Sequence, residues 1–293
     1  MRKSDGLIAK KFSNWKDSKR YIYPMSLILE RRDGHVATLT LNRPERMNVW
    51  NAVMEVGLRA KMAELSVDDE VRVIILTGGG KAFCAGVDVG ALKDLAHGGE
   101  DISQPPAEVR AAMGKGDFEQ RYSYLLDVPK PIICAINGPA AGVGLVLSLY
   151  CDIRYASSKA KLAASFARRG LVAEHGIGWM LPRLIGLPRA LEWLLTGRTL
   201  TAAQALAMGV VSDVYEADVF EVEVATRAKE LAQSVSPRSV RIIKRQIYEA
   251  ASLSLAQACR SAAIEVSAAI RSDDFLEGVQ HFIESRPPHF TGR

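Results

Sequence analysis

Hydrophobic residues follow two different periods along this chain. Residues 71–76 are almost wholly apolar and residues 35–41 alternate apolar with polar, which is typical of strands. Between them, Val53, Leu58 and Met62 recur at helical spacing. The pattern predicts strands at residues 35–41, 71–76, 131–136 and 151–156, and helices at residues 51–65 and 143–150. This alternation of strands and helices predicts an α/β domain.

The pattern changes after about residue 196. Thr201 is expected to cap a helix over residues 202–208, which Gly209 ends. Further helices are predicted at about residues 218–234, 237–250, 255–271 and 273–284. We therefore divide the chain into an N-terminal extension at residues 1–24, an α/β core at 25–196 and a helical C-terminal region at 197–293.

Composition excludes several classes of protein. The 293 residues are 48% hydrophobic and 24% charged, which is ordinary for a globular fold and unlike disordered, collagen-like or coiled-coil chains. The longest apolar runs are too short to span a bilayer, so we expect a soluble protein without a membrane partner.

The positive charge is confined to the first 24 residues. They hold seven Lys and Arg against two Asp, whereas the remainder holds 31 basic and 31 acidic residues. We expect this extension to be disordered and to carry no secretory signal, because it has no apolar stretch of the needed length. The neutral body argues against nucleic acid as a partner.

The cysteines and histidines show no metal-binding or disulfide pattern. The four cysteines stand alone and the five histidines have no ligand spacing. We expect no metal, no disulfide framework and a reducing, cytoplasmic location.

Two glycine-bearing loops follow predicted strands. The first glycine loop (residues 77–88) lacks the Ser or Thr of a P-loop after Lys81, and the second glycine loop (residues 137–144) lacks dinucleotide-binding spacing. The chain contains no G-x-S-x-G nucleophile motif. Such loops can offer unpaired backbone amides, which suit a carbonyl oxygen that becomes an enolate. The alternative is that the glycines only make tight turns.

Several segments together resemble one family. They are LNRPERMN at residues 41–48, KAFCAGVD at 81–88, KPIICAINGPAAGVG at 130–144, CDI at 151–153, LTGRTLTAAQA at 195–205 and EGVQHFIESRPPHF at 277–290. In order and register they resemble the crotonase (enoyl-CoA hydratase/isomerase) superfamily. The resemblance implies a superhelix of repeated ββα turns with a helical C-terminal trimerisation region. It also implies an acyl-CoA substrate, no cofactor apart from the coenzyme A of that substrate, and a homotrimer or a hexamer of paired trimers.

The resemblance also implies where the thioester lies. Its oxygen would accept hydrogen bonds from the amides of Val87 and Val143, and coenzyme A would contact two neighbouring stretches. The residues expected there are Arg46, Met47, Val49, Ala85 and Val87. A solvated surface arginine is the alternative for Arg46.

The departures from the family pattern concern the acids. The two glutamates that activate water in typical hydratases of the family fall at Val146 and Phe166 in this chain. Glu174 is the only acid between Asp152 and Glu192, and its apolar neighbours in the sequence favour a raised pKa and general acid/base chemistry.

The position of Glu174 resembles that of the single acid in double-bond isomerases of the superfamily. The alternative is a glutamate that stabilises a helix N-terminus. His175 is expected either to carry a second proton or to orient Glu174; a packed or capping histidine is the alternative.

Other residues near these motifs receive plainer interpretations. Arg168 and Arg169 are expected to be solvated, Asp88 to fix its loop, and Cys84 to be a packed thiol. His289 and Phe290 are candidates for closing an acyl pocket.

The sequence thus predicts an enoyl-CoA hydratase/isomerase enzyme that stabilises an enolate and uses Glu174 to move a proton. Hydration and double-bond shift both stay open. One alternative is a CoA-thioester or β-diketone C–C hydrolase of the same fold. Another is an inactive scaffold that binds RNA or protein.

Overall fold

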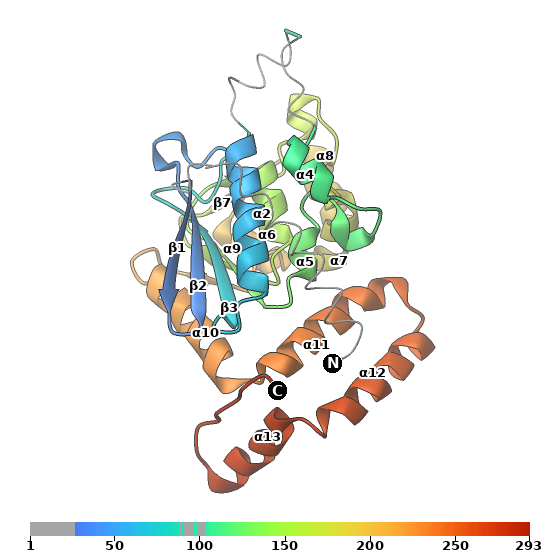
Figure 1. Ribbon diagram of the computed structural model, residues 1–293. Coiled ribbons are helices and arrows are strands. Elements are labelled where there is room, and N and C mark those ends of the chain that lie inside the picture. The colour runs from blue at the N-terminus through green and yellow to red at the C-terminus, as the bar shows by residue number, and fades with distance from the viewer. Residues whose placement is uncertain (1–26, 88–89, 91–96, 99–103) are drawn as a thin grey trace.

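The computed structural model describes residues 27–87, 90, 97–98 and 104–293 (Figure 1). The extension expected at residues 1–24 and the side chain of Asp88 lie outside these residues. The six-stranded main sheet has the order β1 (Ile28–Asp33), β2 (Val36–Leu41), β3 (Val73–Gly78), β4 (Ile132–Ile136), β6 (Ile153–Ser157), β9 (Asp213–Tyr215). Only β1 and β2 pair antiparallel; the other neighbours are parallel.

A second, smaller sheet stands beside the main one. It has the order β5 (Ala140–Ala141), β7 (Lys161–Ala163), β8 (Thr199–Thr201). Its strand β5 belongs to the second glycine loop, so this small sheet fixes the backbone just before helix α6 (Val143–Leu149).

The main sheet separates two hydrophobic cores because side chains alternate along its strands. Leu39, Leu76 and Ile136 point into the larger core, which α2 (Ala52–Ser66) and α6 complete. Val73, Ile75 and Ile133 point into the smaller core under α10 (Phe220–Ser234). The larger core lies beneath the two glycine loops and gives them a rigid base.

The remaining helices complete the body and form an arm. The body carries α4 (Ala107–Ala112), α5 (Tyr124–Asp127), α7 (Ile177–Ile185), α8 (Leu187–Thr196), α9 (Ala202–Met208), and the 3-10 turns Pro44–Arg46, Asp117–Glu119 and Ala167–Arg169. The arm consists of α11 (Pro237–Glu249), the 3-10 turn Ala250–Ser252, α12 (Leu255–Ala269) and α13 (Asp273–Glu284). Figure 1 shows the arm extending away from the α/β body. Among the described residues, no helix is long and apolar enough to cross a bilayer.

Most of the predicted elements are confirmed. Thr201 caps α9 through a reciprocal capping box with Gln204, and Gly209 ends that helix at a φ of 82°. The α/β body and the helical C-terminal segments that the sequence predicts are both present.

The α/β structure continues past residue 196, where the sequence pattern placed the boundary. Strands β8 and β9 both follow that residue, and β9 pairs with β6 at the edge of the main sheet. Each of these strands has only three residues, which is too short for a period of two to stand out.

Candidate functional site

The two glycine loops lie directly against each other. The Cys84 amide donates to the Pro139 oxygen at 3.1 Å, and the Ala141 amide donates to the Cys84 oxygen at 3.0 Å. A Cβ atom at Gly144 would lie 2.1 Å from the Cys84 oxygen, so only glycine allows this approach. Gly86 has a φ of 99°, a conformation that glycine adopts without strain.

The amides of Val87 and Val143 are the two donors expected to bind a thioester oxygen. Val143 is the first residue of α6, where an N–H group has no acceptor within the helix. Within the described ranges, neither amide donates a backbone hydrogen bond in a turn, loop or cap. The arrangement thus presents two donors from two adjoining loops, one of them at the positive end of a short helix.

The stretch expected to contact coenzyme A is joined to the first glycine loop. The Ala85 amide donates to the Met47 oxygen at 3.1 Å, and the Trp50 amide donates to the Gly86 oxygen at 2.7 Å. The side chains of Arg46 and Met47 are exposed and that of Val49 is half-buried. The five residues expected to contact coenzyme A therefore lie together.

Asn48 holds this arrangement, a role that the sequence analysis missed. Its buried side chain donates to the oxygens of Gly79 and Ala82 at 2.9 and 2.8 Å, and accepts from the Arg43 amide at 2.8 Å. Its backbone has a φ of 55°, which asparagine tolerates better than most residues. The sequence feature that could have indicated this role is an asparagine that follows a proline-bearing turn.

Val146 and Phe166, at the positions of the two missing acids, are both buried apolar side chains. Neither can hold or activate a water molecule by hydrogen bonding. Within the described parts of the chain, no group of three or more His, Cys, Asp and Glu side chains is arranged to bind a metal ion.

Glu174 lies in the loop that leads into α7, and its carboxylate is half-shielded from solvent. Its Oε2 atom is 3.5 Å from Nε2 of His175. Burial raises the pKa of the Glu174 carboxyl, and the positive charge of Arg121 opposes that rise. The raised pKa is as expected, but only part of the expected apolar shielding is present: Leu171 and Val172 are exposed, Val172 by 76%, whereas Ile177 is buried.

The Glu174 side chain precedes α7 but does not cap that helix through a hydrogen bond. Helix α7 begins at Ile177 with Gly176 as its N-cap residue and has no side-chain capping bond. The Glu174 carboxylate is therefore available for other contacts.

His175 is held firmly beside Glu174. Its backbone has a φ of 54°, and its carbonyl oxygen accepts a 2.7 Å hydrogen bond from the hydroxyl of Tyr150. Its ring meets the ring of Tyr122 edge-on at 4.9 Å. Burial and, to a lesser extent, the charge of Arg121 lower the pKa of His175 to about 4. A neutral ring at neutral pH favours an orienting role over that of a second proton carrier.

Comparison with known proteins decides the family. The family model described as "Enoyl-CoA hydratase/isomerase" matches residues 31–293. The chain belongs to the enoyl-CoA hydratase/isomerase family. It is accordingly an acyl-CoA enzyme, and its relatives include lyases and isomerases.

Individual members of this family match over nearly their whole length. The 1,2-epoxyphenylacetyl-CoA isomerase of Escherichia coli is 34% identical over 92% of this chain and 100% of its own. A probable enoyl-CoA hydratase of Rhodobacter capsulatus is 36% identical over 88% of this chain and 95% of its own. The crystal structure of an enoyl-CoA hydratase from Bacillus anthracis superposes with a TM-score of 0.80 at 32% identity, covering 91% of this chain and 100% of that one.

Cys84, Arg168 and Arg169 have surroundings that fit the plainer roles expected of them. Cys84 is fully buried, and burial raises the pKa of its thiol to about 12, which fits an inert packed cysteine. Arg168 donates through Nε to the Thr196 oxygen at 2.9 Å, and the Arg169 side chain is exposed.

His289 and Phe290, the two candidates for closing an acyl pocket, contact residues of their own chain. The ring of Phe290 lies 5.9 Å from that of His281, and the His289 amide donates to Glu277 at 2.6 Å. These contacts do not bring either residue to Glu174, so the expected closing of an acyl pocket gains no support within one chain.

The lowered pKa of His175 predicts an acid-dependent loss of stability. The unfolded chain binds a proton at His175 near pH 6.5, whereas the folded chain binds it only near pH 4. The contribution of the neutral His175 ring to the free energy of unfolding is therefore fully present above pH 6.5. It is lost as the pH drops toward 4, by at most about 3 kcal/mol. Urea unfolding at several pH values measures this slope.

The matched control is His175→Asn, which tolerates a positive φ and cannot titrate. Its stability should fall less steeply between pH 6.5 and pH 4.5 than that of the unchanged protein. Equal slopes would mean that His175 is protonated as easily in the folded chain as in the unfolded one.

Proposed function

We propose that this enzyme shifts the double bond of an unsaturated acyl-CoA thioester through an enolate. The observation that carries the proposal is the pair of amides at Val87 and Val143, in two loops that hydrogen-bond to each other; neither donates to a backbone acceptor among the described residues. Two such donors can bind a thioester oxygen and stabilise the negative charge that develops on it. One donor of this kind contributes about 3–4 kcal/mol to transition-state stabilisation.

Glu174 supplies the proton transfer in this proposal. Its carboxylate takes a proton from the carbon next to the carbonyl of a 3-enoyl thioester, and the electron pair moves into the C=O group as an enolate. The carboxylic acid then returns the proton to C4, which leaves a 2-enoyl thioester. The neutral His175 ring, 3.5 Å from the carboxylate, orients it through this exchange.

The residues at positions 146 and 166 favour isomerisation over hydration. Addition of water would need a group to hold the nucleophile, and Val146 and Phe166 are buried hydrocarbon. The E. coli relative is by its name an isomerase of an epoxide-bearing acyl-CoA, so the family includes isomerases as well as hydratases. Hydration remains the second candidate, because several relatives are named as probable hydratases and Glu174 can direct a water.

The coenzyme A part of the substrate is proposed to lie along Arg46, Met47 and Val49 and the loop of Ala85 and Val87. The hydrogen bond between Ala85 and Met47 makes these two segments one surface. The exposed guanidinium of Arg46 suits a phosphate group.

A panel of trans-2-, cis-3- and 2,5-dienoyl-CoA esters tests the reaction. A shifted double bond without water uptake supports isomerisation, and a 3-hydroxyacyl product supports hydration. Release of free CoA would instead indicate a thioesterase, and a shortened acyl product a C–C hydrolase. Binding without turnover would favour the scaffold interpretation, and RNA binding that disappears on deleting residues 1–24 would favour an RNA scaffold.

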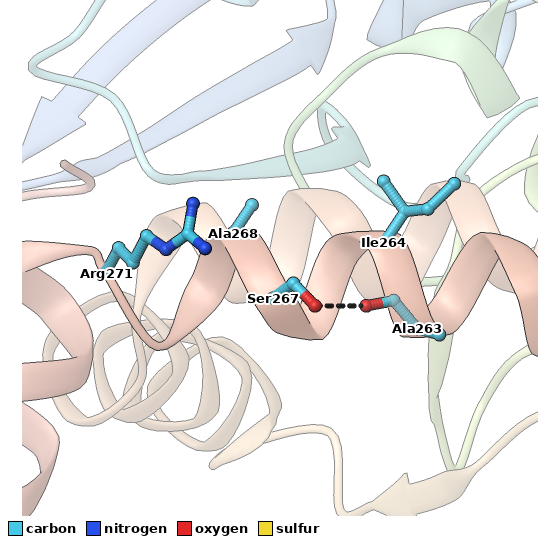
Figure 2. Close-up of a pocket in the computed structure, with 5 residues that line it drawn as sticks. All are labelled: Ala263, Ile264, Ser267, Ala268 and Arg271. Carbon is cyan, nitrogen blue, oxygen red and sulfur yellow. Dashed lines mark hydrogen bonds between the residues drawn. The ribbon is translucent and has the colours of Figure 1, made fainter.

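We further propose that the enzyme assembles as a trimer or a pair of trimers through its C-terminal arm. Helix α12 has no buried residue, and several apolar side chains of the arm are exposed: Leu255, Ile264, Leu276, Phe282 and Ile283. A hollow on the arm is lined by Ile264 and Ala268 of α12 and by Arg271, which follows the end of that helix (Figure 2). An apolar surface of this kind is expected to be covered by another protein surface.

The change Phe282→Asp should weaken this assembly. Phe282 is 79% exposed in one chain, so a charge there leaves the monomer intact but opposes burial in an interface. We expect about a 10- to 100-fold weaker association per contact. Size-exclusion chromatography with light scattering measures the mass at several concentrations.

The matched control is Val222→Asp on α10, another exposed apolar position but one outside the arm. It should leave the mass unchanged. A monomeric wild-type protein, or an assembly insensitive to Phe282→Asp, would contradict the proposed interface.

A further inference from the structure

A buried carboxylate behind the site joins elements that the proposed reaction needs. Glu55 of α2 is only 3% exposed. It accepts hydrogen bonds from Arg121 Nε and Nη2, each at 2.6 Å, and from Trp50 Nε1 and the Tyr122 hydroxyl, each at 3.3 Å. A buried carboxylate is costly unless it is paired and fully hydrogen-bonded, and Glu55 meets both conditions. The mechanism proposed above does not use this group.

Two of the donors to Glu55 reach the two halves of the site. Trp50 pairs with Val87 in a parallel bridge, and its amide donates to the Gly86 oxygen at 2.7 Å. The ring of Tyr122 meets the ring of His175 at 4.9 Å and 88°. Trp50 Nε1 also donates to the Tyr122 hydroxyl at 3.1 Å. The Glu55 carboxylate is thus the shared acceptor between the first glycine loop and the Glu174 loop (residues 170–176).

The Arg121 charge of the Glu55–Arg121 ion pair acts on the acid/base residues. The positive charge of Arg121 lowers the pKa of both Glu174 and His175, although burial is the larger influence on each. Glu55 places the opposite charge against Arg121 at hydrogen-bond distance. The Tyr150 hydroxyl also contacts the Glu174 loop; it donates to the His175 carbonyl oxygen and is uncharged.

We infer that Glu55 and Arg121 are positioning residues, whose ion pair holds the Glu174 loop against the first glycine loop and balances the charge beside Glu174. This inference rests on the proposed function, since it concerns the setting of the acid/base residue. Neither residue is expected to touch the substrate. Their contribution acts through Trp50, Tyr122 and the electrostatic field at Glu174.

Removing one charge at a time tests the inference, because the two changes have opposite electrostatic signs. In Glu55→Gln the charge of Arg121 is left uncompensated and favours ionised Glu174. In Arg121→Gln that charge is gone and ionised Glu174 is disfavoured. The acid limb of the kcat–pH profile should move to lower pH in the first variant and to higher pH in the second, each by about 0.5–1 pH unit.

The rate should change as well as the profile. Loss of the shared acceptor loosens both loops, so kcat should fall about 10- to 100-fold while KM changes less. The double variant Glu55→Gln/Arg121→Gln restores neutrality. Its acid limb should lie between those of the single variants, and it keeps the test available if a single variant fails to fold.

A second buried ion pair supplies the matched control. Lys244 and Asp152 form a 2.7 Å pair of similar burial, and their hydrogen-bond partners in the described part of the chain lie outside the Glu174 loop. Asp152→Asn should lower the free energy of unfolding without moving the acid limb. This control separates a general loss of stability from an effect on Glu174.

A readout that needs no turnover separates this inference from the proposed function. Carbon-13 NMR of glutamate-labelled full-length protein follows the Glu174 carboxyl, which Glu174→Gln assigns. Opposite movements of its titration midpoint in Glu55→Gln and Arg121→Gln support the inference. An unchanged midpoint in both overturns it. Unchanged turnover in Glu174→Gln would instead overturn the proposed function, whatever the titration shows.

Discussion

Replacing Glu174 by glutamine is expected to lower kcat on the preferred enoyl-CoA substrate at least about 100-fold, with little change in KM. Glutamine keeps the size of the side chain but cannot accept the proton from carbon. Binding of coenzyme A does not involve this carboxyl in our proposal, so KM should change little. Steady-state kinetics on purified protein measures both constants.

The same residue sets the expected pH dependence. Burial raises the pKa of the Glu174 carboxyl above the ordinary glutamate value of 4.5. The base form is lost as the pH falls through that raised pKa, so the rate should decline on the acid side at a pH above 4.5. Glu192→Gln, at an exposed ion pair with Arg198, is the matched control and should keep the wild-type rate. Equal rates in Glu174→Gln and wild type would make Glu174 structural.

The change Val143→Pro is expected to lower kcat by about 100- to 1000-fold, the cost of one missing oxyanion donor. Proline has no N–H group, and it is well tolerated at the first position of a helix, which Val143 occupies in α6. The preceding residue, Gly142, has a ψ of −120° and so lies outside the helical region that a following proline disfavours. The variant therefore removes one donor with limited disturbance of the backbone.

Val143→Ala is the control for this substitution because it shortens the side chain and keeps the amide. Its rate should stay within about tenfold of wild type, since no transition-state donor is lost. Thermal unfolding of both variants shows whether the fold persists. A folded Val143→Pro protein with a wild-type rate would show that this amide does not bind the developing negative charge.

The long helices were predictable because their pattern repeats many times. Residues 218–234 and 273–284 were expected to be helical, and α10 and α13 occupy Phe220–Ser234 and Asp273–Glu284. Strands β7, β8 and β9 were missed because three residues give too little pattern. Their pairing depends on neighbours far along the chain, which a local pattern does not contain.

Glu174 stood out in the sequence as a lone acid, and its surroundings were predicted only in part. Leu171 and Val172 face solvent although Ile177 is buried, and the contacts with His175 and the charge of the distant Arg121 were not foreseen. Glu55 was missed altogether. A glutamate on an amphipathic helix is usually solvated, and its partner Arg121 lies 66 positions further along the chain.

Hydrogen exchange at the carbon next to the thioester carbonyl tests the central claim most directly. A 3-enoyl-CoA ester incubated with the enzyme in D₂O should gain deuterium at that carbon, because the partly exposed Glu174 carboxyl exchanges the abstracted proton with solvent before a deuteron is returned there. Mass spectrometry of the recovered thioester measures the gain. The proposed enolate mechanism predicts exchange with the wild-type enzyme and its loss in Glu174→Gln and Val143→Pro. Exchange at the same rate in Glu174→Gln as in wild type would contradict it.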